Sequence, residues 1–158
     1  HRRVRLDLDL DYAIRDLDHF REGPWPWVDD FLASALGRFC PRLESLRGSR
    51  LAHNLSPMAL AHLAACCPRL RDVSLENLEV PPGAAGSWHA ALALPELRKL
   101  DLTFVTAFGD GALAALARQC PQLEVLVLLH TSVTDPGVQL LAAGVFPGLR
   151  ALNIGGLR

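Results

Sequence analysis

The amino-acid sequence predicts an α/β solenoid, a stack of strand–turn–helix units with parallel strands on the concave side and helices on the convex side. The main observation is a short pattern, [CLF]-P-x-L-x-x-[LV]-x-[LIG], that occurs five times. Successive copies are 27, 27, 26 and 26 residues apart, and a fixed period of this size is typical of stacked repeats. Each copy also begins with alternating apolar residues and leads through a turn into a helical pattern. The leading leucines are Leu43, Leu70, Leu97, Leu123 and Leu149.

Residues 1–39 are expected to form a degenerate first repeat with an insertion, which gives five to six repeats in all. Residues Val4–Leu10 alternate apolar and charged side chains, the period of a strand with one buried face. The insertion ends with Trp25 and Trp27, each preceded by a proline. These indoles would either bind a partner or fold over the first repeat, and the sequence leaves both interpretations open. A helix is expected at Val28–Phe39, where apolar residues recur at helical spacing.

Residues 40–158 are expected to form five regular repeat units. One helix should start at Ser56-Pro57, because a hydroxyl can cap a helix and proline suits its first position. A short helix is expected from about Ser87. Asp110 is expected to cap the next helix, and Asp135-Pro136 should open the last one. The expected strands are Leu43–Arg47, Leu70–Glu76, Leu97–Thr103 and Leu123–Leu129, followed by a last strand that includes Ala151 and Asn153.

Two stretches carry a resemblance to a known family: CPQLEVLVLLHTSVTDPGVQLLAAG, which starts at Cys120, and FGDGALAALARQC, which starts at Phe108. Their shared pattern resembles the cysteine-containing leucine-rich repeats of F-box/leucine-rich-repeat proteins, over roughly Phe39–Arg158. The resemblance implies a leucine-rich-repeat solenoid that acts as a scaffold for a protein partner. Its most specific form would be substrate recognition in an F-box-type ubiquitin ligase. The alternative is a structural subunit of a large, stable multi-protein assembly.

Composition excludes several other classes of function. The charges are nearly balanced, with 16 Lys and Arg against 17 Asp and Glu, so no overall field favours nucleic acid. No run reaches the roughly 18 uncharged apolar residues of a membrane span. The sequence contains no zinc-protease motif, nucleophile elbow or glycine-rich phosphate loop. We therefore expect no enzyme, no cofactor and no small-molecule substrate, and we expect the chain to be a segment of a longer protein.

The cysteines occupy one position of the repeat. Cys40, Cys67 and Cys120 each precede the proline of the pattern, where two other units carry Leu94 and Phe146. A position that accepts leucine or phenylalanine is a packing position, so we expect buried thiols rather than a metal site or disulfides. Thiols of this kind indicate an intracellular, reducing compartment, with the cytoplasm or nucleus favoured.

The concave surface is where a partner is expected to bind. Between their buried residues the early strands present charged side chains, whereas the fifth strand presents three apolar ones. Exposed apolar residues side by side favour either a protein partner or a covering segment of the same protein. The predicted partner-binding residues are Val125, Val127, Leu129, Asp72, Glu76, Asp101, Trp25 and Trp27.

Overall fold

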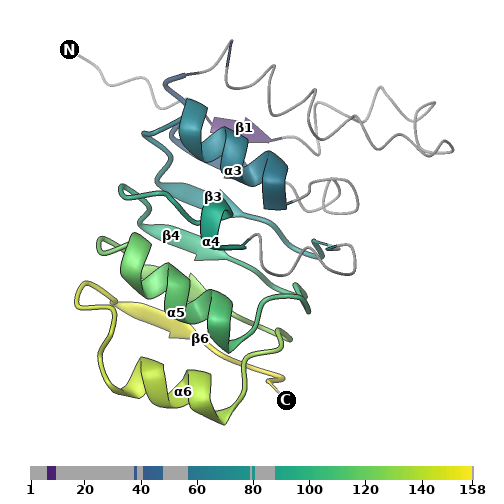
Figure 1. Ribbon diagram of the computed structural model, residues 1–158, viewed down its shortest axis with the longest axis vertical. Coiled ribbons are helices and arrows are strands. Elements are labelled where there is room, and N and C mark those ends of the chain that lie inside the picture. Colours follow the sequence, from purple (N-terminus) through teal and green to yellow (C-terminus); the bar gives the residue numbers. More distant parts are fainter. Residues whose placement is uncertain are drawn as a thin grey trace, which may run out of the picture.

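The structure, a computed structural model, describes residues 7–9, 38, 41–47, 57–78, 80 and 88–157 (Figure 1). Its centre is a parallel sheet of six strands, each hydrogen-bonded to the next one in the sequence. The strands are β1 (Asp7–Asp9), β2 (Ser45–Arg47), β3 (Asp72–Ser74), β4 (Lys99–Asp101), β5 (Val125–Val127) and β6 (Ala151–Asn153). The helices between them are α3 (Pro57–Cys66), α4 (Trp88–Ala91), α5 (Asp110–Gln119) and α6 (Asp135–Ala142).

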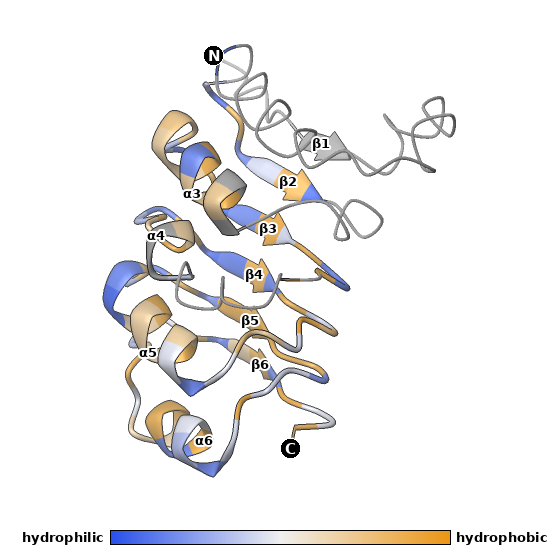
Figure 2. Cartoon of the chain, turned by 45° about the vertical axis from the view of Figure 1, so that its right-hand side comes forward, coloured by the Kyte–Doolittle hydropathy of each residue, from blue (hydrophilic) through white to orange (hydrophobic). Residues whose placement is uncertain are grey.

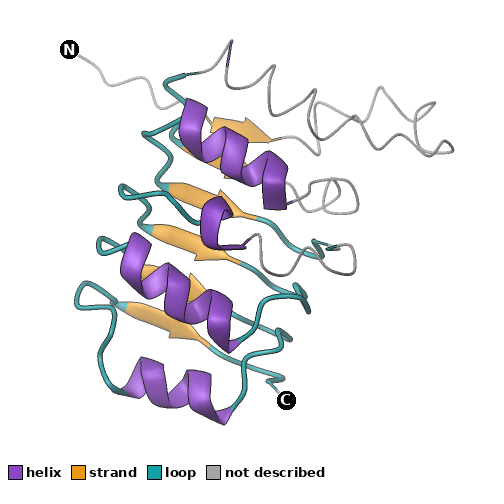
Figure 3. Ribbon diagram, viewed as in Figure 1, coloured by secondary structure: helices purple, strands orange, loops and turns teal. Residues whose placement is uncertain are grey.

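The helices α3 to α6 lie on one side of the sheet, and no helix of the described ranges covers its other face (Figures 2 and 3). We call the uncovered side the open face. This arrangement follows from the parallel strands, since the chain must cross back to the start of the sheet after every strand. The predicted mixed α/β fold with a parallel sheet is confirmed.

The repeat period sets the register of the sheet. The middle residues of all six strands pair in one continuous row, which runs Leu8, Leu46, Val73, Leu100, Leu126 and Leu152. Of these, Leu46, Val73, Leu100 and Leu126 are at most 3% exposed. They pack with helix residues such as Leu113 and Leu116 into one hydrophobic core, in which Trp88 meets the edge of Phe108 at 5.5 Å between ring centroids.

The strands are shorter than predicted, with three residues each rather than five to seven. The alternation of apolar residues continues beyond each strand, because Leu75, Leu102 and Leu128 are also buried. There, however, the backbone turns. In the fourth unit, for example, the Val105 N–H donates to the Leu102 carbonyl at 3.0 Å, a turn bond rather than a ladder bond.

The expected role of Asp110 as the capping residue of α5 is wrong. The N-cap of α5 is Gly109, without a side-chain capping hydrogen bond, and Asp110 is the first helical residue. Its carboxylate instead accepts hydrogen bonds from Thr134, at the N-cap of α6, from the backbone N–H at 2.9 Å and the hydroxyl at 2.5 Å. Asp110 therefore links two successive repeats.

Several predictions fall on residues that the structure does not describe. They concern Trp25, Trp27, Cys40, Ser56 and Ser87, together with the helix expected at Val28–Phe39 apart from Arg38, which is helical. The division of the chain at residue 39 likewise stays a prediction. Within the described ranges, no helix is long and apolar enough to cross a membrane.

Candidate interaction surface

The open face is formed by the residues on either side of the buried row, because neighbouring residues in a strand point to opposite faces. The register aligns them into two further rows across the sheet. One row runs Ser45, Asp72, Lys99, Val125 and Ala151, and the other runs Arg47, Ser74, Asp101, Val127 and Asn153. Charged residues from β2 to β4 thus give way to apolar residues on β5.

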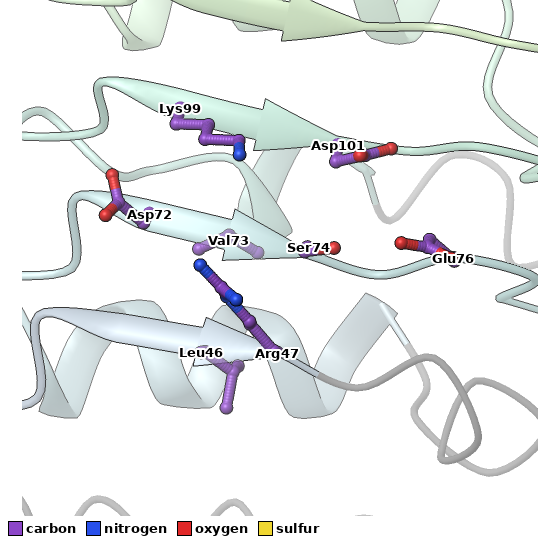
Figure 4. A pocket seen from close by; sticks show the side chains of 8 residues that line it. All are labelled: Leu46, Arg47, Asp72, Val73, Ser74, Glu76, Lys99 and Asp101. Carbon is purple, nitrogen blue, oxygen red and sulfur yellow. The ribbon is translucent and has the colours of Figure 1, made fainter. Parts of the chain in front are cut away.

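The three acidic residues predicted for partner binding come together on this face. Asp72, Glu76 and Asp101 line one hollow of about 190 Å³ (Figure 4). Arg47 and Lys99 line it as well, so its charge is mixed rather than purely acidic. In Figure 4 the carboxylates of Glu76 and Asp101 lie at the end of the hollow toward which the strands point. The terminal nitrogens of Arg47 and Lys99 lie nearer its opposite end.

Asp101, the last residue of β4, is held in position by Thr103, two residues further along the chain. Oδ1 of Asp101 accepts a hydrogen bond from the Thr103 hydroxyl at 2.7 Å and another from the Thr103 backbone N–H at 3.1 Å. Both bonds use the same oxygen atom, so the second oxygen of this half-buried carboxylate keeps its capacity to accept a charged donor. The carboxylate is therefore held in one orientation.

The apolar residues of β5 and of the two positions after it alternate between the core and the open face, as the sequence predicts. Val125, Val127 and Leu129 are half-buried, whereas the alternating Leu126 and Leu128 are completely buried in the core. A methyl group added at Gly155 would come within 2.9 Å of Leu129 Cδ2, so the Leu129 side chain extends over this glycine. The placement on the open face is as predicted, and the role of these residues in partner binding stays a prediction.

Val125, Val127 and Leu129 are called the apolar row from here on. Two residues beside it were missed by the sequence analysis. Phe104 and His130 follow β4 and β5, and their rings stack with 4.7 Å between centroids and 4° between planes. Phe104 is 50% exposed, and His130 is also exposed. The signal that could have found them was their repeat position, since Asn77 and Gly156 occupy the same place in neighbouring units. Asparagine and glycine are the usual residues of a left-handed turn.

The cysteines have a packing role in the part of the chain described. Cys67 and Cys120 are completely buried, as predicted. The Cys120 thiol donates to the Leu92 carbonyl at 3.3 Å, and burial raises its pKa to about 11. Cys120 therefore stays protonated and unreactive at neutral pH. Cys66 lies 3.6 Å from Nε2 of His62 on α3, but no group of three or more His, Cys, Asp or Glu among the described residues could hold a metal ion.

With this geometry established, comparison with known proteins gives the class of repeat. The chain is 31% identical over 111 residues to F-box/LRR-repeat protein 4 of Bos taurus, which covers 68% of this chain and 18% of that protein. It is 34% identical over 84 residues to Tubulin-specific chaperone E of Bos taurus, covering 53% of this chain and 16% of the chaperone. Protein NLRC5 of Mus musculus is 34% identical over 121 residues, which cover 74% of this chain and 6% of that protein.

All three relatives are proteins of the leucine-rich-repeat type, and this confirms the predicted resemblance to an F-box/leucine-rich-repeat segment. No family model matches the chain. The chain spans less than a fifth of the length of each of these relatives.

Proposed function

We propose that the chain is a non-catalytic leucine-rich-repeat solenoid that binds a protein partner on its open face. The observation that carries the proposal is the row of Val125, Val127 and Leu129, which lies on the face opposite the core. Because these side chains are half-buried already, covering each one would contribute only about 1 kcal/mol, below the roughly 1.5–3 kcal/mol of complete burial. Together with Phe104 they are sufficient for a modest binding patch.

The most specific version of this function is substrate recognition in an F-box-type ubiquitin ligase inside the cell. Its support is the similarity to F-box/LRR-repeat protein 4, together with buried thiols that suit a reducing compartment. Tubulin-specific chaperone E carries a name that describes a different role, so the comparisons support the repeat more strongly than this particular role. The alternative, a structural subunit, would place the same surface in a permanent assembly.

The proposal is tested with the double variant Val127→Thr and Leu129→Ser. Threonine resembles valine in shape, and it avoids placing a second carboxylate beside Asp101, the register partner of Val127. The probe is a phage-displayed library of random dodecapeptides. We expect the wild-type chain to enrich a set of peptides and the double variant to bind them at least about tenfold more weakly, a loss of about 1.4 kcal/mol.

The control for this experiment is Leu126→Thr, which alters the core on the other face of the same strand. It should lower the free energy of unfolding by several kcal/mol, whereas the double variant should stay within about 1 kcal/mol of the wild type. If the double variant unfolds as readily as the control, its side chains belong to the core. If it enriches the same peptides as the wild type, the apolar row binds nothing.

A further inference from the structure

Besides the residues of the open face, one residue from each of four successive repeats forms a line just beyond the ends of the strands. Asn77, Phe104, His130 and Gly156 occupy one repeat position and have φ angles of 60°, 63°, 54° and 60°. The N–H groups of the first three each donate at 2.8 Å to a carbonyl of the following repeat, at Thr103, Leu129 and Gly155. Successive residues of this line therefore lie about 5 Å apart, the spacing of neighbouring strands. We call this line the turn ledge.

Phe104 is an unusual residue for the turn ledge. A bulky side chain at positive φ is rare, and such backbone strain is found where the surroundings impose it, often at functional sites. Burial does not account for Phe104, because the residue is 50% exposed. The following repeat does support its ring, since His130 stacks against one face in parallel. His130 in turn lies against Gly156, where a Cβ atom would overlap Nδ1 of the imidazole ring.

Phe104 is half-exposed, and His130 stacks on only one face of its ring. His130 approaches from the β5 side, so the opposite ring face is directed toward β3, where Asn77 is exposed. Glu76 directly precedes Asn77, and Thr103, which directly precedes Phe104, orients the carboxylate of Asp101. The apolar residues Val127 and Leu129 follow on the other side. An aromatic ring, two carboxylates and apolar side chains thus lie on three adjacent repeats, at or near the ends of β3, β4 and β5.

We propose that the turn ledge binds an arginine side chain carried by an extended segment of a partner protein. The guanidinium stacks on the uncovered face of Phe104 and pairs with the carboxylates of Glu76 and Asp101. Arginine suits this site better than lysine, because its planar group stacks on aromatic rings and pairs with carboxylates in a fixed geometry.

The spacing also defines the second contact of the partner. Alternate residues of an extended chain point the same way and lie about 6.6 Å apart, comparable to the distance of about 5 Å from one strand to the next. An apolar residue two positions from the arginine therefore reaches Val127 and Leu129. The predicted motif is Arg-x-apolar or its reverse. This inference rests on the proposed function, to which it adds the chemistry of the partner.

Phe104 can be replaced without disturbing the turn. Asparagine already occupies the same position in the preceding repeat as Asn77, with nearly the same φ, so Phe104→Asn should keep the fold while removing the aromatic face. Phe104→Tyr retains the ring and should retain binding. Asp101→Asn removes one charge but keeps an acceptor for Thr103. Asp135→Asn removes an exposed charge from α6 on the helix side and serves as the matched control.

The experiment combines selection from a random dodecapeptide library with binding measured by fluorescence anisotropy. Peptides selected by the wild-type chain should be enriched in Arg-x-apolar. Replacing the arginine of a selected peptide by citrulline, which is uncharged but similar in shape, should weaken binding at least about tenfold. Phe104→Asn and Asp101→Asn should reduce this arginine preference to less than about threefold, and Phe104→Tyr and Asp135→Asn should preserve it.

Each other outcome is decisive. Selection of peptides without arginine, or equal affinity for the arginine and citrulline peptides, overturns the inference, as does a preference that survives Phe104→Asn. If such a result occurs while the Val127→Thr and Leu129→Ser variant still binds the selected peptides more weakly than the wild type, the arginine proposal is wrong and the proposed function stands. If the wild-type chain enriches no peptide, both proposals fail.

Discussion

Asp110 shows how much a single side chain does to join two repeats. Its carboxylate accepts hydrogen bonds from the hydroxyl and the backbone N–H of Thr134, and these bonds hold its pKa below the ordinary value of 3.8. Partial burial acts in the opposite direction but is the weaker effect. The carboxylate also lies in the first turn of α5, where negative charge is favourable. Both the hydrogen bonds and the helix terminus stabilise the charged form in the folded state.

We predict that Asp110→Asn lowers the free energy of unfolding at neutral pH by about 1.5–2 kcal/mol, the lower part of the range for hydrogen bonds to a charged group. Because the pKa is lowered by folding, the contribution of Asp110 is fully present above pH 3.8 and is lost as the pH falls through the lower, folded-state pKa. Urea unfolding at neutral pH and at about pH 2 should therefore show that the difference between wild type and variant disappears in acid.

Asp135→Asn is the control for this comparison, because Asp135 also lies in the first turn of its helix but is exposed. It should lower the free energy of unfolding by only about 0.3–1 kcal/mol, the range for a surface charge at a helix N-terminus. Equal losses in the two variants would show that the helix terminus, rather than the bond to Thr134, accounts for the effect of Asp110.

At the scale of the helices, α5 and α6 occupy the same place in successive repeats, and each has a glycine near its start. The glycine of α6 is closely surrounded by other atoms, whereas that of α5 is not. A Cβ atom at Gly137 in α6 would overlap Oδ1 of Asp110 and would lie 2.6 Å from Cγ1 of Val133. A Cβ atom at Gly111 in α5 would have no atom within 4 Å. The first glycine permits close contact between the two helices, whereas the second leaves open space at the helix surface.

We predict that Gly137→Ala destabilises the fold by about 1–3 kcal/mol, because the added methyl group must displace the carboxylate that joins the repeats. Gly111→Ala should instead stabilise the fold by up to about 1 kcal/mol, since alanine is the better helix former. Thermal unfolding of the two variants beside the wild type measures both effects. A stabilising Gly137→Ala would mean that the contact between α5 and α6 is looser than the structure shows.

The sequence predicted which side chains of each strand are buried better than it predicted how long the strands are. Which face is buried follows from alternation and from the repeat period, and these place Leu126 in the core and Val127 outside it. Strand length was overestimated because Leu102 continues the alternation although the backbone turns there. The stacking of Phe104 on His130 could not be predicted in the same way, because it depends on left-handed residues that follow two adjacent strands and on Gly156 beyond them.

For the molecule as a whole, stability arises at the boundaries between successive repeats. Every described strand pairs only with the strands one repeat before and after it. Ion pairs also join neighbouring repeats, for example Arg71 with Glu96 at 3.0 Å and Arg98 with Glu124 at 2.8 Å. Their side chains are about one-third to one-half exposed, so each pair contributes no more than about 1 kcal/mol. The row of strand-middle residues, which is buried from Leu46 to Leu126, contributes more than these ion pairs.

The row of strand-middle residues allows the same substitution to be compared inside the stack and at its edge. Leu100 and Leu152 occupy the same register position, but Leu100 is 1% exposed between β3 and β5, whereas Leu152 in the edge strand β6 is 40% exposed. We predict that Leu100→Ala costs about 2–5 kcal/mol, because it removes a fully packed side chain and leaves a cavity. Leu152→Ala should cost about 1 kcal/mol or less, since much of its surface already meets water.

Urea unfolding of the two variants measures this difference directly, and the slope of the transition carries further information. In a stack with nearest-neighbour coupling, Leu100→Ala weakens the boundaries on both sides of β4, so the unfolding transition should broaden or split. Leu152→Ala affects only the outermost boundary and should shift the midpoint slightly without changing the slope. Equal losses in both variants would mean that Leu152 is covered in solution, for example by a second molecule on the edge of β6, and repeating the measurement at several protein concentrations would detect that association.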